Sequence, residues 1–172
     1  EALDGLVWTP WRSVLFAEET ITSQLPDPDA PQAQSGLLYE MKFKKGDPST
    51  MEAINVRPML GSLAHEGIEI DEEGNVYVID EDRKGSIYRF VPKNYGDLRS
   101  GQLYALRVKN GMKTGDAEWV ALDMNQVQIN ARVAAQSVNA TSFCRPEDLE
   151  RIRNTLYAAL TCEDAINPNN VD

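Results

Sequence analysis

Short runs in which apolar and polar residues alternate are the feature of this sequence that most constrains its fold. The runs are rich in Val, Ile, Tyr and Leu, and Gly, Asn, Asp and Pro separate them. This pattern is typical of β-strands joined by turns. It predicts strands at residues 13–17, 36–43, 67–71, 75–80, 86–91, 103–108, 118–122 and 155–161. We therefore expect an all-β fold class.

The segment from Gly67 to Pro92 is the clearest structural unit in the chain. Residues 72–75 predict a tight turn between two alternating runs, and a third run follows. Three antiparallel strands in succession form a meander, which is most of one blade of a β-propeller. Residues 100–122 repeat the pattern, and such repetition favours radial blades over a sandwich.

The length predicts one partial propeller domain over residues 1–172. At roughly 40 to 45 residues a blade, the chain supplies about three to four blades, whereas closed propellers have about four to eight. Two long loops are expected, at about 22–35 and about 123–142, and the second could hold a short helix. We interpret the chain as a fragment or a partner-dependent piece, which a second chain could complete.

Charge and hydropathy exclude two classes of partner. The sequence has 27 acidic and 17 basic residues, a formal charge of −10, so its surface would repel a phosphate backbone and nucleic acid is not expected. No stretch approaches the roughly 18 apolar residues of a membrane span. The first residues lack the features of a signal peptide, so the protein is either cytosolic or has lost a leader.

The segment from Phe143 to Asn154 allows two interpretations. Pro146 and the acids after it suit the first turn of a helix, but a loop that enters a strand is equally compatible. The two cysteines, Cys144 and Cys162, form neither a disulfide framework nor a zinc-type pattern. They could form one bridge, which the sequence leaves open.

Acidic residues at strand ends are the candidates for chemistry. His65, the single histidine, stands beside Glu66 just before a strand, and isolated pairs of this kind are more often surface residues. Glu18 and Glu19 end an apolar strand and would point to opposite faces. Most such carboxylates are simply solvated, but a few could converge on calcium.

Two further clusters combine acids with arginine. Residues 80–83 place three acids beside Arg83 without the spacing of an EF-hand, so any calcium there would be held by several distant loops. Arg145 and Glu147 share one side of an extended segment. This pair suits phosphate esters, because an arginine fork binds phosphate oxygens while a carboxylate holds a metal.

The chain contains, in this order, the motifs TPWRSVLFAEE, GSLAHEGIEID, EDRKGSIYRFVP, SGQLYALRV, and CRPEDLE followed by TLYAALT. Together they resemble the motifs of the PhoX-type alkaline phosphatases, in the same order and over nearly the whole chain. The resemblance implies a β-propeller, exported to the periplasm or beyond, whose calcium- and iron-containing site hydrolyses phosphate monoesters. Its small-molecule substrate would be a phosphate ester.

The resemblance also assigns residues. By motif, the metal ligands or their neighbours would be Glu18, Glu19, Glu66, Asp82 and Glu147. Arg145 would bind the substrate phosphate and act with Glu147 as a catalytic residue, and Arg83 would help to bind the substrate. The implied chemistry is metal-assisted phosphoryl transfer.

The sequence departs from the family pattern in two places. Nothing before Thr9 supplies the Asn-Cys-Gly segment that carries the family's cysteine ligand, and Arg12 replaces a glycine after TPW. A non-catalytic calcium-binding propeller subunit, with a structural or interaction role, therefore remains the alternative function. Phytase-like or lactonase-like calcium propellers share the architecture, but the RPED and HEG strings favour the PhoX type.

Overall fold

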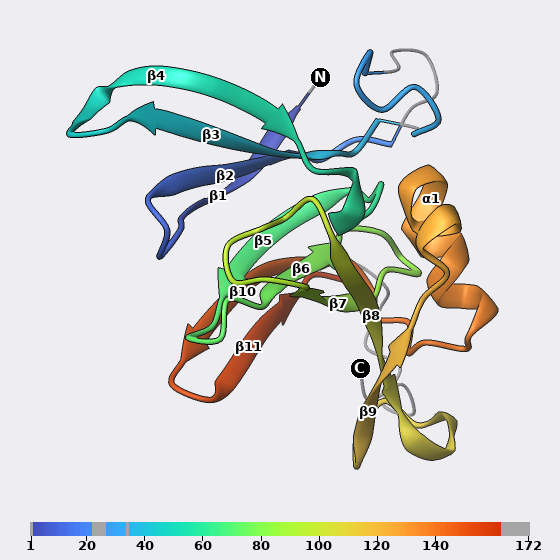
Figure 1. Cartoon of the computed structure of the whole chain (residues 1–172). Coiled ribbons are helices and arrows are strands. Elements are labelled where there is room, and N and C mark those ends of the chain that lie inside the picture. The colour runs from blue at the N-terminus through green and yellow to red at the C-terminus, as the bar shows by residue number, and fades with distance from the viewer. Residues whose placement is uncertain (1, 22–26, 34, 163–172) are drawn as a thin grey trace.

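The computed structural model describes residues 2–21, 27–33 and 35–162, and it shows a mostly β molecule (Figure 1). Its strands form a four-stranded sheet, a five-stranded sheet and a two-stranded hairpin. All pairings are antiparallel, and each strand pairs with its neighbour in sequence. Local turn signals therefore sufficed to predict most of the strands.

The first sheet contains two predicted strands and two that the sequence analysis missed. It consists of β1 (Leu3–Trp8), β2 (Ser13–Glu18), β3 (Leu38–Lys44) and β4 (Asp47–Val56). The alternation of β1 is broken by a bulge between Asp4 and Leu6. Strand β4 begins with Asp-Pro-Ser-Thr, residue types that usually form turns. Both strands were missed because their local patterns are not those of a regular strand.

The second sheet confirms the predicted meander and extends it. It consists of β5 (His65–Ile70), β6 (Val76–Asp80), β7 (Ile87–Pro92), β8 (Gly101–Val108) and β9 (Ala117–Ala121). At the turn after β5, the Asp71 carboxylate accepts hydrogen bonds from the backbone amides of Glu73 and Asn75, at 3.0 and 2.9 Å. This local bonding explains why the turn could be recognised from the sequence.

One core cluster joins both larger sheets. Leu15, Leu38, Tyr88, Phe90 and Leu103 are fully buried in it, together with smaller residues at alternate strand positions. Each large apolar side chain contributes roughly 1.5–3 kcal/mol when it leaves water. In Figure 1 the first sheet lies above the second, as consecutive blades would.

Helix α1 (Met124–Ser137) fills most of the segment for which a long loop with a short helix was expected. The Asp123 side chain caps its N-terminus by accepting a 2.9 Å hydrogen bond from the Asn125 amide. Its buried face is made of Val127, Ala131, Ala134 and Ala135. These small side chains gave only a weak apolar pattern, so the sequence allowed a short helix here but did not predict one of 14 residues. Two 3₁₀ turns, η1 (Pro58–Leu60) and η2 (Lys109–Gly111), complete the helical elements.

The C-terminal hairpin decides between the two interpretations of the segment after Phe143. Residues Pro146–Ile152 form strand β10, which pairs with β11 (Thr155–Leu160). The helix alternative is wrong, because Leu149 is buried against the second sheet and Arg145 has a left-handed φ of 47°. A disulfide joins Cys144 to Cys162 across the open end of the hairpin.

Two remaining expectations concern the first long loop and the membrane. Residues 22–26 and 34 of the loop expected at about 22–35 lie outside the described residues, and 27–33 contain turns. Within the part of the chain that the structure describes, no helix combines the length and the apolar character needed to cross a membrane.

Candidate metal and phosphate site

Strand β5 separates two environments, because successive side chains point to opposite faces. The His65 side chain is fully buried, and its Nε2 lies 3.1 Å from the carbonyl oxygen of Gly61. Burial lowers the pKa of His65 to about 4, so the ring is neutral. Glu66, the next residue, is only partly buried. His65 therefore belongs to the core, and Glu66 is the residue of this pair that is available for chemistry.

Close backbone contacts bring other strands against β5 on both sides of Glu66. A Cβ atom on Gly5 would lie 2.1 Å from the carbonyl oxygen of Glu66, and one on Gly67 would lie 2.4 Å from the amide nitrogen of Leu149. Only glycine permits such approaches. The acids of β1 and β10 are thereby placed beside Glu66.

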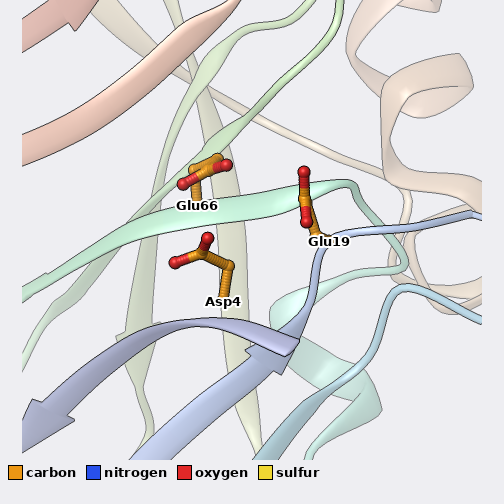
Figure 2. A group of neighbouring side chains, drawn as sticks. All are labelled: Asp4, Glu19 and Glu66. Carbon is orange, nitrogen blue, oxygen red and sulfur yellow. The ribbon is translucent and has the colours of Figure 1, made fainter. Parts of the chain in front are cut away.

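Two overlapping groups of carboxylates share Glu66. One consists of Asp4, Glu19 and Glu66, which point toward one another in Figure 2, and the other of Glu66, Glu81 and Glu147. Within each group, oxygen atoms of the three side chains lie within 4.8 Å of one another. We call these five residues the carboxylate cluster. It gathers side chains from strands and turns that are far apart in the sequence.

Burial and mutual repulsion raise pKa values in the carboxylate cluster. The pKa of Glu66 rises to about 7, first because of burial and then because of the negative charges of Asp4, Glu81, Glu19 and Glu147. The pKa of Glu19 is also raised, by burial first and then by Glu81. Like charges at this distance disfavour ionisation. A bound cation would remove this repulsion.

Arg145 lies at the edge of the carboxylate cluster. Its Nε donates a 2.9 Å hydrogen bond to Oε1 of Glu81, and its Nη2 also contacts this oxygen. The same Nη2 lies 2.9 Å from Oε1 of Glu147. The Arg145 side chain is 36% exposed. Arg145 is therefore both paired with two members of the carboxylate cluster and partly accessible to solvent, and a guanidinium of this kind can bind an anion.

Three of the residues assigned by resemblance lie outside the carboxylate cluster formed by the described residues. Glu18 is buried, and its carboxylate accepts hydrogen bonds from the amides of Gly36 and Leu37 at 2.7 and 3.0 Å. Asp82 forms an ion pair with Arg132 at 2.9 Å. Arg83 is exposed. Their roles as ligands or substrate contacts stay predictions.

The sequence analysis assigned no role to two members of the carboxylate cluster, Asp4 and Glu81. Glu81 belongs to the acidic run at 80–83, so its position after a strand was a usable signal. Asp4 had no such signal, because its place beside Glu66 depends on how β1 crosses β5. The structure does bring together Glu19, Glu66 and Glu147, which were assigned from separate motifs.

The carboxylate cluster fits a hard cation such as calcium. All five members offer carboxylate oxygens, which calcium prefers. The histidine and the two cysteines, which are softer donors, are committed elsewhere: His65 to the core, and Cys144 and Cys162 to the disulfide. The residues present therefore suit calcium, and iron stays a prediction from the resemblance.

Comparison with known proteins identifies a family and a similar fold. The family model described as alkaline phosphatase PhoX matches residues 7–171. Among solved structures, PhoX from Pseudomonas fluorescens in complex with vanadate, a transition state analogue, matches with a TM-score of 0.62 and 24% identity. None of the curated proteins has a sequence that matches.

The structural match confirms the all-β, partial propeller fold that the sequence predicted. It covers 85% of this chain but 36% of the Pseudomonas chain, so the present chain spans little more than a third of that protein. The family model, in contrast, matches nearly the full length of the chain. The chain belongs to the alkaline phosphatase PhoX family.

Proposed function

We propose that this chain carries part of the active site of a metal-dependent phosphatase that hydrolyses phosphate monoesters. The carboxylate cluster with Arg145 at its edge is the observation that carries the proposal. It supplies ligands for a cation and a fork for phosphate oxygens within one small region. Family membership supports the same reaction class.

Glu19, Glu66, Glu81, Glu147 and Asp4 would hold calcium in this proposal. When bound, the cation would neutralise charge on the phosphoryl group and polarise an oxygen nucleophile. The raised pKa values of Glu19 and Glu66 support this assignment, because they reflect burial first and then repulsion between the acids, which a cation would relieve. Iron, Glu18 and Asp82 belong to the proposal through the family resemblance alone.

Arg145 would bind and orient the phosphate of the substrate. Its ion pairs with Glu81 and Glu147 hold the guanidinium beside these two members of the carboxylate cluster. A planar guanidinium can bind two phosphate oxygens at once and keep the phosphorus atom in line for attack. Glu147 would act both as a ligand and as a support for Arg145, and Arg83 would be a more distant helper.

The setting of the site is also part of the proposal. The Cys144–Cys162 disulfide supports an oxidising compartment, such as the periplasm or the outside of the cell. Because this chain spans 36% of the Pseudomonas protein, we propose that further β-sheets complete the site. They could come from the same polypeptide or from a second chain.

The test is metal analysis of the native protein together with hydrolysis of p-nitrophenyl phosphate, with and without a chelator. We expect bound calcium and turnover that the chelator abolishes. A protein that binds calcium but shows no turnover would support the non-catalytic alternative. A protein that binds no metal and shows no turnover would contradict the proposal.

Matched variants locate the activity. Arg145→Ala and Glu147→Gln should each reduce kcat/KM at least 100-fold, the scale for removing a group that stabilises transition-state charge. Arg153→Ala is the control for the first, since Arg153 also has a positive φ and lies in the same hairpin. Glu150→Gln, on the same strand as Glu147 but exposed, is the control for the second.

A further inference from the structure

The backbone of Arg145 is held in a conformation that arginine rarely adopts. Its φ of 47° lies in the left-handed region, which costs free energy for a residue with a Cβ atom. Such conformations persist only where the surroundings enforce them, and they gather at functional sites. The surroundings of Arg145 must therefore enforce this conformation.

Two backbone hydrogen bonds fix Arg145 on either side. Its amide donates to the carbonyl oxygen of Asp82 at 2.8 Å, and its carbonyl oxygen accepts from the amide of Thr161 at 3.0 Å. The first bond ties Arg145 to the turn after β6, which also carries Glu81. The second ties it to the chain just after β11. The left-handed residue is thus fastened to two separate segments.

The disulfide joins the two segments of chain that contain Arg145 and Thr161. Cys144 and Cys162 are the neighbours in sequence of Arg145 and Thr161. The hairpin turn lies at the opposite end, next to Arg153, and β10 and β11 are already paired between the two ends. The disulfide therefore fastens the end of the hairpin that the turn does not hold.

Thr161 also reaches Glu147. Its hydroxyl donates a hydrogen bond to the Glu147 carboxylate. The residue that holds the Arg145 carbonyl thus also orients the carboxylate paired with the Arg145 guanidinium. Both side chains depend on the position of the segment that the disulfide secures.

We propose that the Cys144–Cys162 disulfide is a positioning device, which holds the left-handed Arg145 so that its guanidinium faces incoming phosphate. This inference rests on the proposed phosphate-binding role of Arg145. Cys144, Cys162 and Thr161 are positioning residues, because they act through Arg145 and do not touch substrate. The oxidised disulfide makes the site ready for the anion, and its loss lets Arg145 leave the left-handed region.

The first test measures inorganic phosphate binding by calorimetry in saturating calcium, with the whole protein. We expect the Cys144→Ser/Cys162→Ser variant to bind phosphate about tenfold more weakly than the wild type, while its calcium affinity changes less than twofold. A disulfide that only stabilised the fold would leave phosphate affinity unchanged in the folded variant. Equal phosphate affinity with and without the disulfide would therefore overturn the proposal.

A double-mutant cycle shows whether the effect passes through Arg145. In an Arg145→Ala background, which already lacks the guanidinium, removing both cysteines should change phosphate affinity less than twofold. A further tenfold loss there would contradict the positioning role. Far-UV circular dichroism confirms that each variant is folded at the temperature of measurement.

Hydrogen exchange of the wild type followed by NMR separates this inference from the proposed function. The Arg145 and Thr161 amides should be strongly protected, because both donate to the backbone of neighbouring segments. Exchange at the rate of an exposed loop would overturn the proposal even if the variant failed to fold. If the wild type binds no phosphate, the proposed function fails, whereas protected amides would still support the constraint on Arg145.

Discussion

Two carboxylates on neighbouring sheets, Glu40 of β3 and Glu66 of β5, have opposite surroundings. Glu40 is 1% exposed and accepts hydrogen bonds from Arg57, Trp11 and Ser13, at 2.5 to 3.0 Å. Burial alone would raise its pKa, but these donors, Arg57 first, hold the pKa below the usual value. Glu66 instead faces other acids, and its pKa rises to about 7.

This comparison separates carboxylates that hold the fold from those that can bind a ligand. The charge of Glu40 is balanced by Arg57, and neutral groups donate further hydrogen bonds to it. Glu40 therefore does not need a bound cation. In the carboxylate cluster five acids lie together, and Arg145 forms ion pairs with two of them, Glu81 and Glu147. Repulsion among such acids favours a bound cation, whereas a carboxylate matched like Glu40 gains nothing from one.

The largest expected effect concerns Arg57. Arg57→Ala leaves the Glu40 charge buried without its main partner, so we expect a loss of about 3–5 kcal/mol in the free energy of unfolding. Urea denaturation measures it. The control is Arg107→Ala, which breaks an exposed ion pair with Glu118 and should cost about 1 kcal/mol or less. If both variants lost the same free energy of unfolding, the buried Glu40 would depend on its arginine no more than the exposed Glu118 does, and the comparison would be wrong.

The next effect concerns His65, which lies beside Glu66 but faces the core. Its pKa falls from about 6.5 when unfolded to about 4 in the folded protein. The unfolded chain therefore takes up the proton first, so stability is complete above pH 6.5 and falls by roughly 3 kcal/mol as the pH drops toward 4. Because His65 is the single histidine, its NMR signal is easily assigned. A titration midpoint near 6.5 in the folded protein would contradict its burial.

A smaller effect is expected for Glu66→Gln. Without calcium, the substitution removes repulsion within the carboxylate cluster and should stabilise the protein by about 1 kcal/mol or less, because solvent screens a partly exposed group. With calcium, it should weaken cation binding at least tenfold. Thermal unfolding with and without calcium measures both, with Glu150→Gln as the control. A destabilising Glu66→Gln in the absence of calcium would show that Glu66 is already balanced, as Glu40 is.

The smallest effect is the pH dependence of that difference. The folded pKa of Glu66 is raised above the unfolded value, so the wild type favours the protonated form and loses stability as the pH rises from about 4.5 through about 7. The stability advantage of Glu66→Gln without calcium should grow over this window and then level off. The His65 contribution cancels, because both proteins contain it. An advantage that is constant between pH 4.5 and 8 would contradict the raised pKa.

Local patterns predicted the strands whose residues alternate regularly and end in clear turns. The β5–β6 turn is an example, since Asp71 bonds to amides only two and four residues away. The bulged strand β1 was missed, as was β10, whose start at Pro146 resembles a helix N-terminus in sequence. In both cases the strand forms because of partners in the sheet or across the hairpin, which a local pattern does not contain.

The residues of the site also divide into those that the sequence indicated and those that it did not. Motif order pointed to Glu19, Glu66, Glu147 and Arg145, and the structure places all four in one region. Asp4 could not be predicted, because it reaches the carboxylate cluster only where Gly5 lets β1 approach the backbone of β5.

The sequence by itself determined the all-β class, most of the strands, the acidic balance and the family, because these depend on residue types and their order. Only the tertiary structure decided which acids face one another, that His65 belongs to the core, and that Cys144 and Cys162 are bridged beside Arg145. These properties depend on distances between strands that are far apart in the chain. Burial and electrostatic repulsion depend on such distances, so they arise only once the sheets have packed.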